Sequence, residues 1–116
     1  MNRNGKLNIE DYVQAYALTQ IVSIDLLIKD KEGKYILGLR RNPPAKNTYF
    51  VPGCHVFKGE NVKKALIRTM KQEIGCVLNN IEFYGVYEHM YQNDNPVDTP
   101  NVDIHYVVIV FTPLEI

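Results

Sequence analysis

The chain has 116 residues and a mass of 13.4 kDa, which is enough for one domain and too little for two hydrophobic cores. Hydrophobic residues make up 46% and charged residues 22%, a balance typical of globular proteins rather than disordered ones. Thirteen basic and thirteen acidic residues give a formal net charge of zero, which excludes broad electrostatic binding to nucleic acid or acidic membranes. No apolar run is long enough to span a bilayer, and two cysteines without metal-ligand spacing indicate reduced thiols and a cytoplasmic protein.

Three elements are predicted in the first part of the chain. Residues 8–18 place apolar side chains at helical spacing, with Asn8 at the position of an N-cap. Residues 20–29 and 34–40 are rich in β-forming side chains and flank the Gly-containing turn 30–33. Two such runs across a short turn predict a β-hairpin.

Four further elements are predicted in the second part. Residues 49–53 predict a short strand that Pro and Gly end. Residues 60–74 have an amphipathic helical pattern, and Gly75 follows where a C-terminal cap belongs. The remaining predictions are strands at 81–91 and 102–112, with a polar loop at 92–101 that could close over a site. A helix among strands predicts an α+β domain.

The stretch 52–76, PGCHVFKGENVKKALIRTMKQEIGC, carries the chemically informative spacing. Glu60 and Arg68 lie about two helical turns apart, so their side chains can pair. Glu60 at the predicted helix start would also complement the helix dipole. Glu73 lies in the last predicted turn and can face the Pro–Gly loop at Gly53. A carboxylate beside backbone carbonyl oxygens suits a hard divalent cation such as Mg²⁺.

This stretch resembles the Nudix box, G-x5-E-x7-R-E-U-x-E-E-x-G-U, where U is a bulky aliphatic residue. The positions that agree are Glu60, Arg68, Glu73 and Gly75, and those that differ are Cys54, Thr69 and Gln72. The flanking strings VSIDLL, LGLRRN, YFVPG, FYGVYEHMY and HYVV are similar to the GDP-mannose mannosyl hydrolase branch of the Nudix family. The resemblance covers roughly residues 20–112 and implies one Nudix domain over 1–116. That domain would be an α/β/α sandwich with a mixed sheet and the box helix.

The resemblance also implies an activity, namely hydrolysis of GDP-mannose to GDP and mannose with one Mg²⁺ ion, Mn²⁺ being possible. Water would attack the sugar C1 carbon and the nucleoside diphosphate would leave. Ordinary Nudix enzymes cleave a phosphoanhydride with several ions and several box glutamates, whereas Thr69 and Gln72 replace two of those glutamates here. Their loss agrees with a one-ion site in which charge neutralisation of the leaving group matters most.

Residue by residue, the Gly53 carbonyl and the Glu73 side chain match the metal ligands of the branch. Asp25 and Arg40 match positions that contact substrate, and Arg40 would clamp the diphosphate. His89 matches a histidine that assists catalysis near the sugar. His55 stands where the branch has a diphosphate-binding arginine, which a protonated histidine could partly replace.

Family members also continue beyond the segment that ends here at Ile116. That continuation carries a C-terminal helix, a glutamine metal ligand and the histidine thought to act as general base. No residue of this chain matches either side chain, so the resemblance implies a chain that is short at its C-terminal end. The resemblance suggests a homodimer, and a chain that lacks its last elements would leave apolar surface that a partner could cover.

Several residues also have plain structural interpretations. Asp25 could lie on an exposed strand face, Arg40 could be a strand-end solvent contact, and His89 could be a packed histidine beside aromatic side chains. Glu60 and Arg68 are interpreted as a structural pair rather than as catalytic groups. The remaining interpretations are His105 as structural, Cys54 as a small loop residue, Cys76 as core, and Tyr84, Tyr87 and Tyr91 as core and pocket wall.

Three functions therefore remain open at this point. The first is the mannosyl hydrolase, acting on a small nucleotide sugar and not on nucleic acid or membranes. The second is a pyrophosphohydrolase that releases a nucleoside monophosphate and a sugar phosphate. The third is a nucleotide-sugar-binding domain without turnover.

Overall fold

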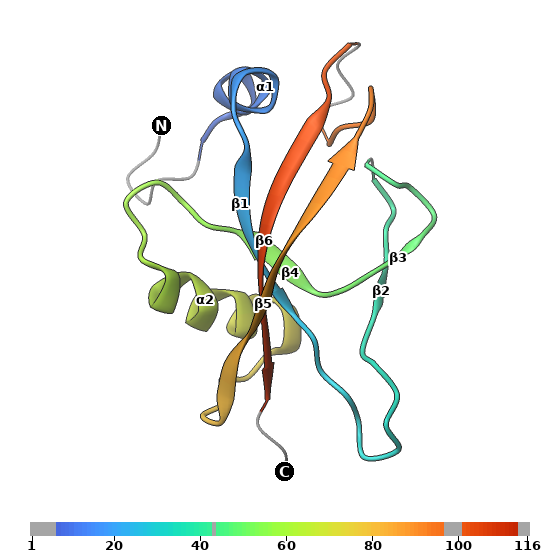
Figure 1. Ribbon diagram of the computed structural model, residues 1–116, viewed down its shortest axis with the longest axis vertical. Coiled ribbons are helices and arrows are strands. Elements are labelled where there is room, and N and C mark those ends of the chain that lie inside the picture. Colours follow the sequence, from blue (N-terminus) through green and yellow to red (C-terminus); the bar gives the residue numbers. More distant parts are fainter. Residues whose placement is uncertain (1–6, 43, 97–100, 114–116) are drawn as a thin grey trace.

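The centre of the molecule is a four-stranded mixed sheet, seen in a computed structural model that describes residues 7–42, 44–96 and 101–113. The strands are β1 (Ile21–Leu26), β4 (Gly53–His55), β5 (Ile81–Tyr91) and β6 (Ile104–Pro113). Their order is β4–β1–β6–β5, with β1 and β6 parallel and the other neighbours antiparallel (Figure 1). A two-stranded ribbon of β2 (Gly38–Leu39) and β3 (Tyr49–Phe50) stands beside this sheet.

Two helices accompany the sheet, α1 (Ile9–Leu18) and α2 (Val62–Ile74). The predicted N-cap of α1 is confirmed, since the Asn8 side chain accepts a hydrogen bond from the Asp11 N–H at 2.9 Å. Helix α2 ends at Gly75, whose φ of 74° is the left-handed conformation that favours glycine, again as predicted. Its start differs from the prediction, because Asn61 is the N-cap and Glu60 lies ahead of the helix.

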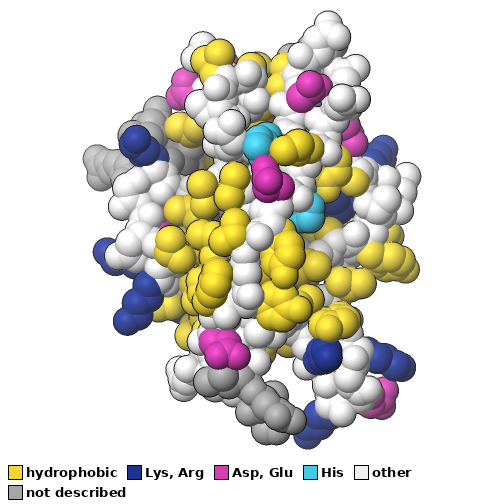
Figure 2. All heavy atoms as spheres, viewed as in Figure 1, with side chains coloured by type: hydrophobic (Ala, Val, Ile, Leu, Met, Phe, Trp, Pro, Cys, Tyr) yellow, Lys and Arg dark blue, Asp and Glu magenta, His cyan; other side chains and the backbone are white. Residues whose placement is uncertain are grey.

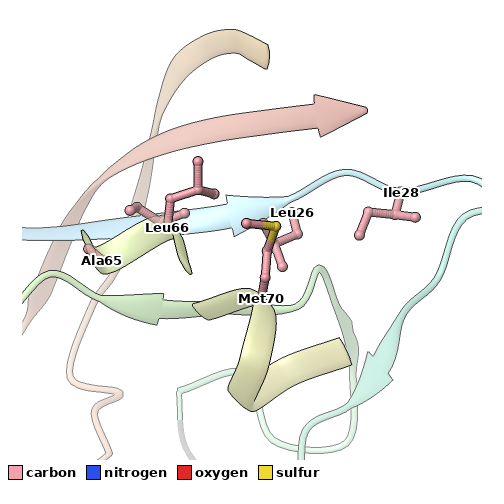
Figure 3. Close-up of a cluster of buried hydrophobic side chains, with 6 residues drawn as sticks. Leu26, Ile28, Ala65, Leu66 and Met70 are labelled. Carbon is pink, nitrogen blue, oxygen red and sulfur yellow. The ribbon is translucent and has the colours of Figure 1, made fainter. Parts of the chain in front are cut away.

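The main core lies between α2 and β1 (Figure 3). Its buried members come from alternate positions of β1 and the residues just after it and from one face of α2, namely Ile24, Leu26, Ile28, Ala65, Leu66 and Met70. Because side chains alternate along a strand, Ser23 and Asp25 point to the opposite face of the sheet. A second cluster of Tyr16, Val102 and Ile104 attaches α1 to the end of β6.

The predicted hairpin over residues 20–40 forms only in part. The turn is present, with Gly33 at φ 81° and an isolated bridge between Lys29 and Tyr35. Beyond that bridge the second run leaves β1 and pairs through β2 with β3 instead. Strand β4 pairs with the edge of β1 that the second run leaves free. The sequence predicts a strand over 49–53 that ends at Gly53, whereas β4 begins there. That prediction was wrong because glycine here permits close strand approach rather than ending the strand.

Strand β5 is the edge of the main sheet and exposes apolar side chains on both faces. Met90 is 65% exposed and Phe83 60%, and yellow spheres form a broad band over this region in Figure 2. Tyr84 and Tyr87 share this exposure, so the prediction that they are core residues is wrong. Cys76, also predicted as core, lies exposed just after α2. Within the described residues, no helix is long and apolar enough to cross a membrane.

Candidate active site

A cavity of about 540 Å³ opens on the face of the sheet to which Ser23 and Asp25 point and extends round the β4 edge toward α2. Helix α1, strands β1, β4, β5 and β6, helix α2 and the two loops after β2 and β5 all contribute to its wall. The polar and charged lining residues are Tyr12, Tyr16, Ser23, Asp25, Arg40, Tyr49, Cys54, His55, Arg68, Gln72, His89, Tyr91 and Tyr106. Its size is within the range of small-molecule sites.

The predicted metal ligands lie on two neighbouring elements, Gly53 on β4 and Glu73 in the last turn of α2. The Cys54 thiol lies 3.4 Å from Gln72 Oε1 and 3.5 Å from Glu73 Oε1. Gly53, one residue before Cys54, pairs with Asp25 across the β1–β4 ladder. A Cβ atom on Gly53 would lie 2.2 Å from Asp25 Oδ1 and 2.4 Å from the Ile24 carbonyl oxygen, so only glycine fits there.

This donor set fits Mg²⁺ better than a thiophilic ion. It offers the Glu73 carboxylate and backbone oxygens, and Mg²⁺ commonly takes one or two carboxylates and completes its shell with water and substrate phosphates. Among the described residues, no group of three or more His, Cys, Asp or Glu side chains could hold a metal ion. A cation here would therefore depend on the ligand for part of its coordination.

Asp25 and His89 face each other across the cavity wall. His89 Nε2 lies 3.8 Å from Asp25 Oδ2, and the His89 ring stacks with Tyr91 at 6.5 Å. Burial, together with the nearby Glu73 carboxylate, raises the pKa of Asp25 to about 7. Near neutral pH this carboxyl can therefore hold or release a proton beside the histidine.

Arg40 follows β2 and enters the cavity from the ribbon. Its Nε donates to the Pro44 carbonyl at 2.6 Å and to the Asn42 carbonyl at 3.3 Å. Its guanidinium lies 5.5 Å from the centre of the Phe50 ring. A fixed guanidinium in a cavity wall is suited to bind a phosphate group.

The environment of His55 does not suit the role that the resemblance implies, namely a cation that binds the diphosphate. Its Nδ1 lies 2.8 Å from Ser23 Oγ, and its Nε2 lies 3.4 Å from the Tyr16 hydroxyl. Burial, together with the nearby Arg40 and Arg68 cations, lowers the pKa of His55 to about 4. His55 is therefore neutral at pH 7 and does not supply the positive charge that a protonated histidine would bring to a diphosphate.

The structural pairing of Glu60 and Arg68 is confirmed. Arg68 donates from Nε to Glu60 Oε2 at 2.8 Å and from Nη2 to Glu60 Oε1 at 2.9 Å. The same Nη2 donates to the His55 carbonyl at 2.6 Å, and the guanidinium lies 3.7 Å from the Phe57 ring centre. This network fixes β4 and the following loop against α2, and so holds Gly53 near Glu73.

Sequence reasoning missed an aromatic cluster at the α1 end of the cavity. Tyr12 and Tyr16 stack at 5.7 Å, and the His55 ring lies 5.2 Å from that of Tyr106. Burial raises the pKa of Tyr16 to about 12, so its hydroxyl stays protonated at neutral pH. The spacing of Tyr12 and Tyr16, one helical turn apart, was the available signal, but both residues fitted the apolar stripe of a helix equally well.

The chain belongs to the Nudix family. The NUDIX domain model matches residues 19–115. A structure titled MutT NUDIX hydrolase from Burkholderia pseudomallei superposes with a TM-score of 0.66 at 22% identity, covering 84% of this chain and 68% of that one. The predicted fold, an α+β Nudix domain with a mixed sheet and the box helix, is thereby confirmed.

Two curated relatives give closer sequence matches. The low-salt glycan biosynthesis protein Agl8 of Haloferax volcanii is 35% identical over 103 residues, which is 88% of this chain and 64% of that protein. An ADP-ribose pyrophosphatase of Methanocaldococcus jannaschii is 36% identical over 66 residues, which is 57% of this chain and 38% of that protein. The chain thus spans less than two thirds of the length of either relative.

Proposed function

We propose that this chain is a divalent-cation-dependent hydrolase of a nucleoside diphosphate sugar, and that it converts GDP-mannose and water to GDP and mannose. The observation that carries the proposal is one cavity lined by Gly53, Arg40 and the Asp25–His89 pair, with the Glu73 carboxylate 3.5 Å from the thiol of another lining residue, Cys54. Together these residues would provide a cation site, a phosphate clamp and a proton-transfer pair. Agl8, a glycan biosynthesis protein by name, supports a substrate that contains a sugar.

Two substituted box positions favour attack at the sugar over attack at phosphorus. Thr69 is fully buried, and its hydroxyl donates to the Ala65 carbonyl at 2.7 Å. Gln72 accepts from Arg68 Nη1 at 3.1 Å and carries no charge. Neither position can therefore supply a carboxylate for a second or third ion. A single cation suits a reaction in which the main demand is to neutralise a leaving diphosphate.

The chain's own residues have distinct parts in this reaction. Glu73 and the Gly53 carbonyl would hold Mg²⁺, or Mn²⁺ in its place, and the ion would withdraw charge from the diphosphate. Arg40 binds the same diphosphate and orients it. Asp25 and His89 orient the sugar and the attacking water and exchange protons with them. A cytoplasmic location and a homodimer stay predictions.

The alternative is a pyrophosphohydrolase, which the similarity to an ADP-ribose pyrophosphatase favours. Both reactions use the same cation and clamp and differ in the atom that water attacks. A third candidate, a nucleotide-sugar-binding domain without turnover, uses the cavity alone.

One experiment separates these functions. The protein is incubated with GDP-mannose and Mg²⁺ in ¹⁸O-labelled water, and the products are identified by chromatography and mass spectrometry. GDP with ¹⁸O-labelled mannose is expected, because attack at C1 places the water oxygen on the sugar. Label in GDP would place the attack at phosphorus, and GMP with mannose 1-phosphate would establish the alternative; no product from folded protein would favour the binding domain.

Matched variants link the result to the site. Glu73→Gln should remove turnover, since it deletes the one carboxylate expected to bind the cation. Glu82→Gln makes the same chemical change on an exposed position of β5 that does not line the cavity, and should leave turnover unaltered. Equal loss in both variants would count against the assignment of the cation site.

A further inference from the structure

The orientation of Arg40 depends on the turn over residues 44–48. Its Nε is held by the Pro44 carbonyl at 2.6 Å, and its backbone is tied to the far side of the same turn. The Arg40 N–H donates to the Thr48 carbonyl, and the Asn47 N–H donates to the Arg40 carbonyl, each at 2.8 Å. Any change in the shape of this turn therefore moves the guanidinium relative to the cavity.

The turn contains a backbone conformation that its own sequence disfavours. Ala45 has φ 55°, in the left-handed region that is unfavourable for a residue with a Cβ atom. Ala45 directly follows Pro44, whose carbonyl holds Arg40. A residue held in such a conformation needs support from its surroundings.

That support comes from the opposite rim of the cavity. Asp94, in the loop after β5, accepts a hydrogen bond from the Ala45 N–H through Oδ2 at 2.7 Å. A charged acceptor makes this a stronger hydrogen bond than one between neutral groups.

Asp94 itself lies on a well-anchored stretch. The preceding residue, Asn93, donates its N–H to Asp103 Oδ1 at 2.6 Å and accepts from the Asn101 N–H at 2.6 Å. The following residue, Asn95, is 2% exposed and donates to the Val102 carbonyl at 3.0 Å. The Asp94 carboxylate is thus presented to Ala45 from a fixed position.

We propose that Asp94 is a positioning residue for substrate binding, which acts by holding Ala45 and hence the Pro44 carbonyl that orients Arg40 in the cavity. The inference rests on the proposed function in so far as Arg40 binds the diphosphate. It assigns to the loop after β5 a share in anion binding, although that loop brings a negative charge to the rim. Asp94 therefore favours anion binding by holding Arg40 in place and opposes it through its own negative charge.

Because these two effects change anion affinity in opposite directions, the affinity of Asp94 variants tests the proposal. Binding of inorganic pyrophosphate in the presence of Mg²⁺ is measured by calorimetry for Asp94→Ala, Asp94→Asn and Glu82→Ala. Asp94→Ala should weaken binding about tenfold, a loss typical of one charged hydrogen bond. Asp94→Asn loses the same charge but keeps an oxygen that can accept from Ala45, and should stay within about threefold of the parent protein. Glu82→Ala removes a carboxylate on an exposed position of β5 that does not line the cavity, so its effect should be as small.

A second readout does not depend on any ligand. The Arg40 Nε–H should exchange with solvent faster in Asp94→Ala than in the parent protein or in Asp94→Asn, as measured by NMR, with the backbone spectrum as the check on folding. For turnover, Asp94→Ala should raise KM more than it lowers kcat. Unchanged or tighter pyrophosphate binding in Asp94→Ala, unchanged Nε–H exchange, or an equal loss in Glu82→Ala would each overturn the proposal.

Arg40→Gln separates this inference from the proposed function. If Arg40→Gln binds pyrophosphate more weakly while Asp94→Ala keeps full affinity, the role of Asp94 is refuted and the anion-binding role of Arg40 stands. Unchanged binding in Arg40→Gln would instead remove Arg40 from the anion site and contradict the proposed function. In that case faster Nε–H exchange in Asp94→Ala would still show that Asp94 holds Arg40.

Discussion

Replacement of Arg68 by lysine should destabilise the protein strongly even though the charge is kept. Lysine cannot reproduce the two parallel hydrogen bonds to Glu60, the bond to the His55 carbonyl and the stacking on Phe57 together. The two side chains are only 20% and 14% exposed, so solvent screens the pair less than at an open surface. Each lost hydrogen bond contributes about 1 kcal/mol, and the sum falls short of full additivity, which gives a loss of about 2–3 kcal/mol.

Urea and thermal denaturation followed by circular dichroism measure this loss. For a domain of this size, about 2–3 kcal/mol corresponds to a fall in Tm of roughly 10 °C. Lys64→Met, at an exposed position of the same helix, should change the free energy of unfolding by less than about 0.5 kcal/mol. A fall of only that size in Arg68→Lys would refute the reasoning, because the network would then contribute no more than an exposed charge.

The same pair predicts a dependence on pH. Hydrogen bonding to Arg68 lowers the pKa of Glu60, so the pair stabilises the fold above the unfolded-state pKa of about 4.5 and this contribution falls as pH decreases through the folded-state pKa. The difference between the parent protein and Arg68→Lys should therefore shrink in acid. If the difference in stability between the two proteins stays constant from pH 7 to acid, Arg68 stabilises the fold by contacts other than its pairing with Glu60.

Three further outcomes are expected. In EDTA, and so without metal, the parent protein should lose stability as pH rises from about 3.8 to about 7, because burial raises the pKa of Asp25. The loss should be about 3–4 kcal/mol, and Asp25→Asn should abolish this slope in denaturant titrations. Gly53→Ala should lower the free energy of unfolding by more than about 2 kcal/mol, because its Cβ would overlap the Asp25 carboxylate; an unaltered midpoint would contradict the close approach of the strands. Cys76 should react with a thiol reagent before Cys54, whose pKa burial raises, and Cys76→Ser should remove the fast phase.

Local patterns predicted much of the helical structure. Helix α1 and its Asn8 cap, and the end of α2 at Gly75, follow from caps and periodicity that act within a few residues. Strand β5 was predicted with its observed bounds, and β6 to within two residues at its start. Such signals are local, so one sequence is enough to read them.

The errors arose where distant parts of the chain decide the local structure. The sequence predicts a strand that ends at Gly53, whereas Gly53 begins β4, where the adjacent Asp25 leaves no room for a side chain. The neutral state of His55 depends on burial against Tyr16 and Tyr106, which come from opposite ends of the chain. The contact from Asp94 to Ala45 spans 49 residues and has no local signature.

The parallel pairing of β1 with β6 also has a consequence for the order in which the protein folds. Strand β1 lies in the interior of the sheet, and the bond from Thr112 Oγ1 to the Leu27 carbonyl closes a loop of 85 residues. A nascent chain that has exposed β1, β4 and α2 must wait for β6 before the sheet can close, and pairing over such a distance is slow. Asp25 sits on β1, so the cavity is assembled in the last stage of folding, and until then the edge of β1 that pairs with β6 remains open to chaperones or to aggregation.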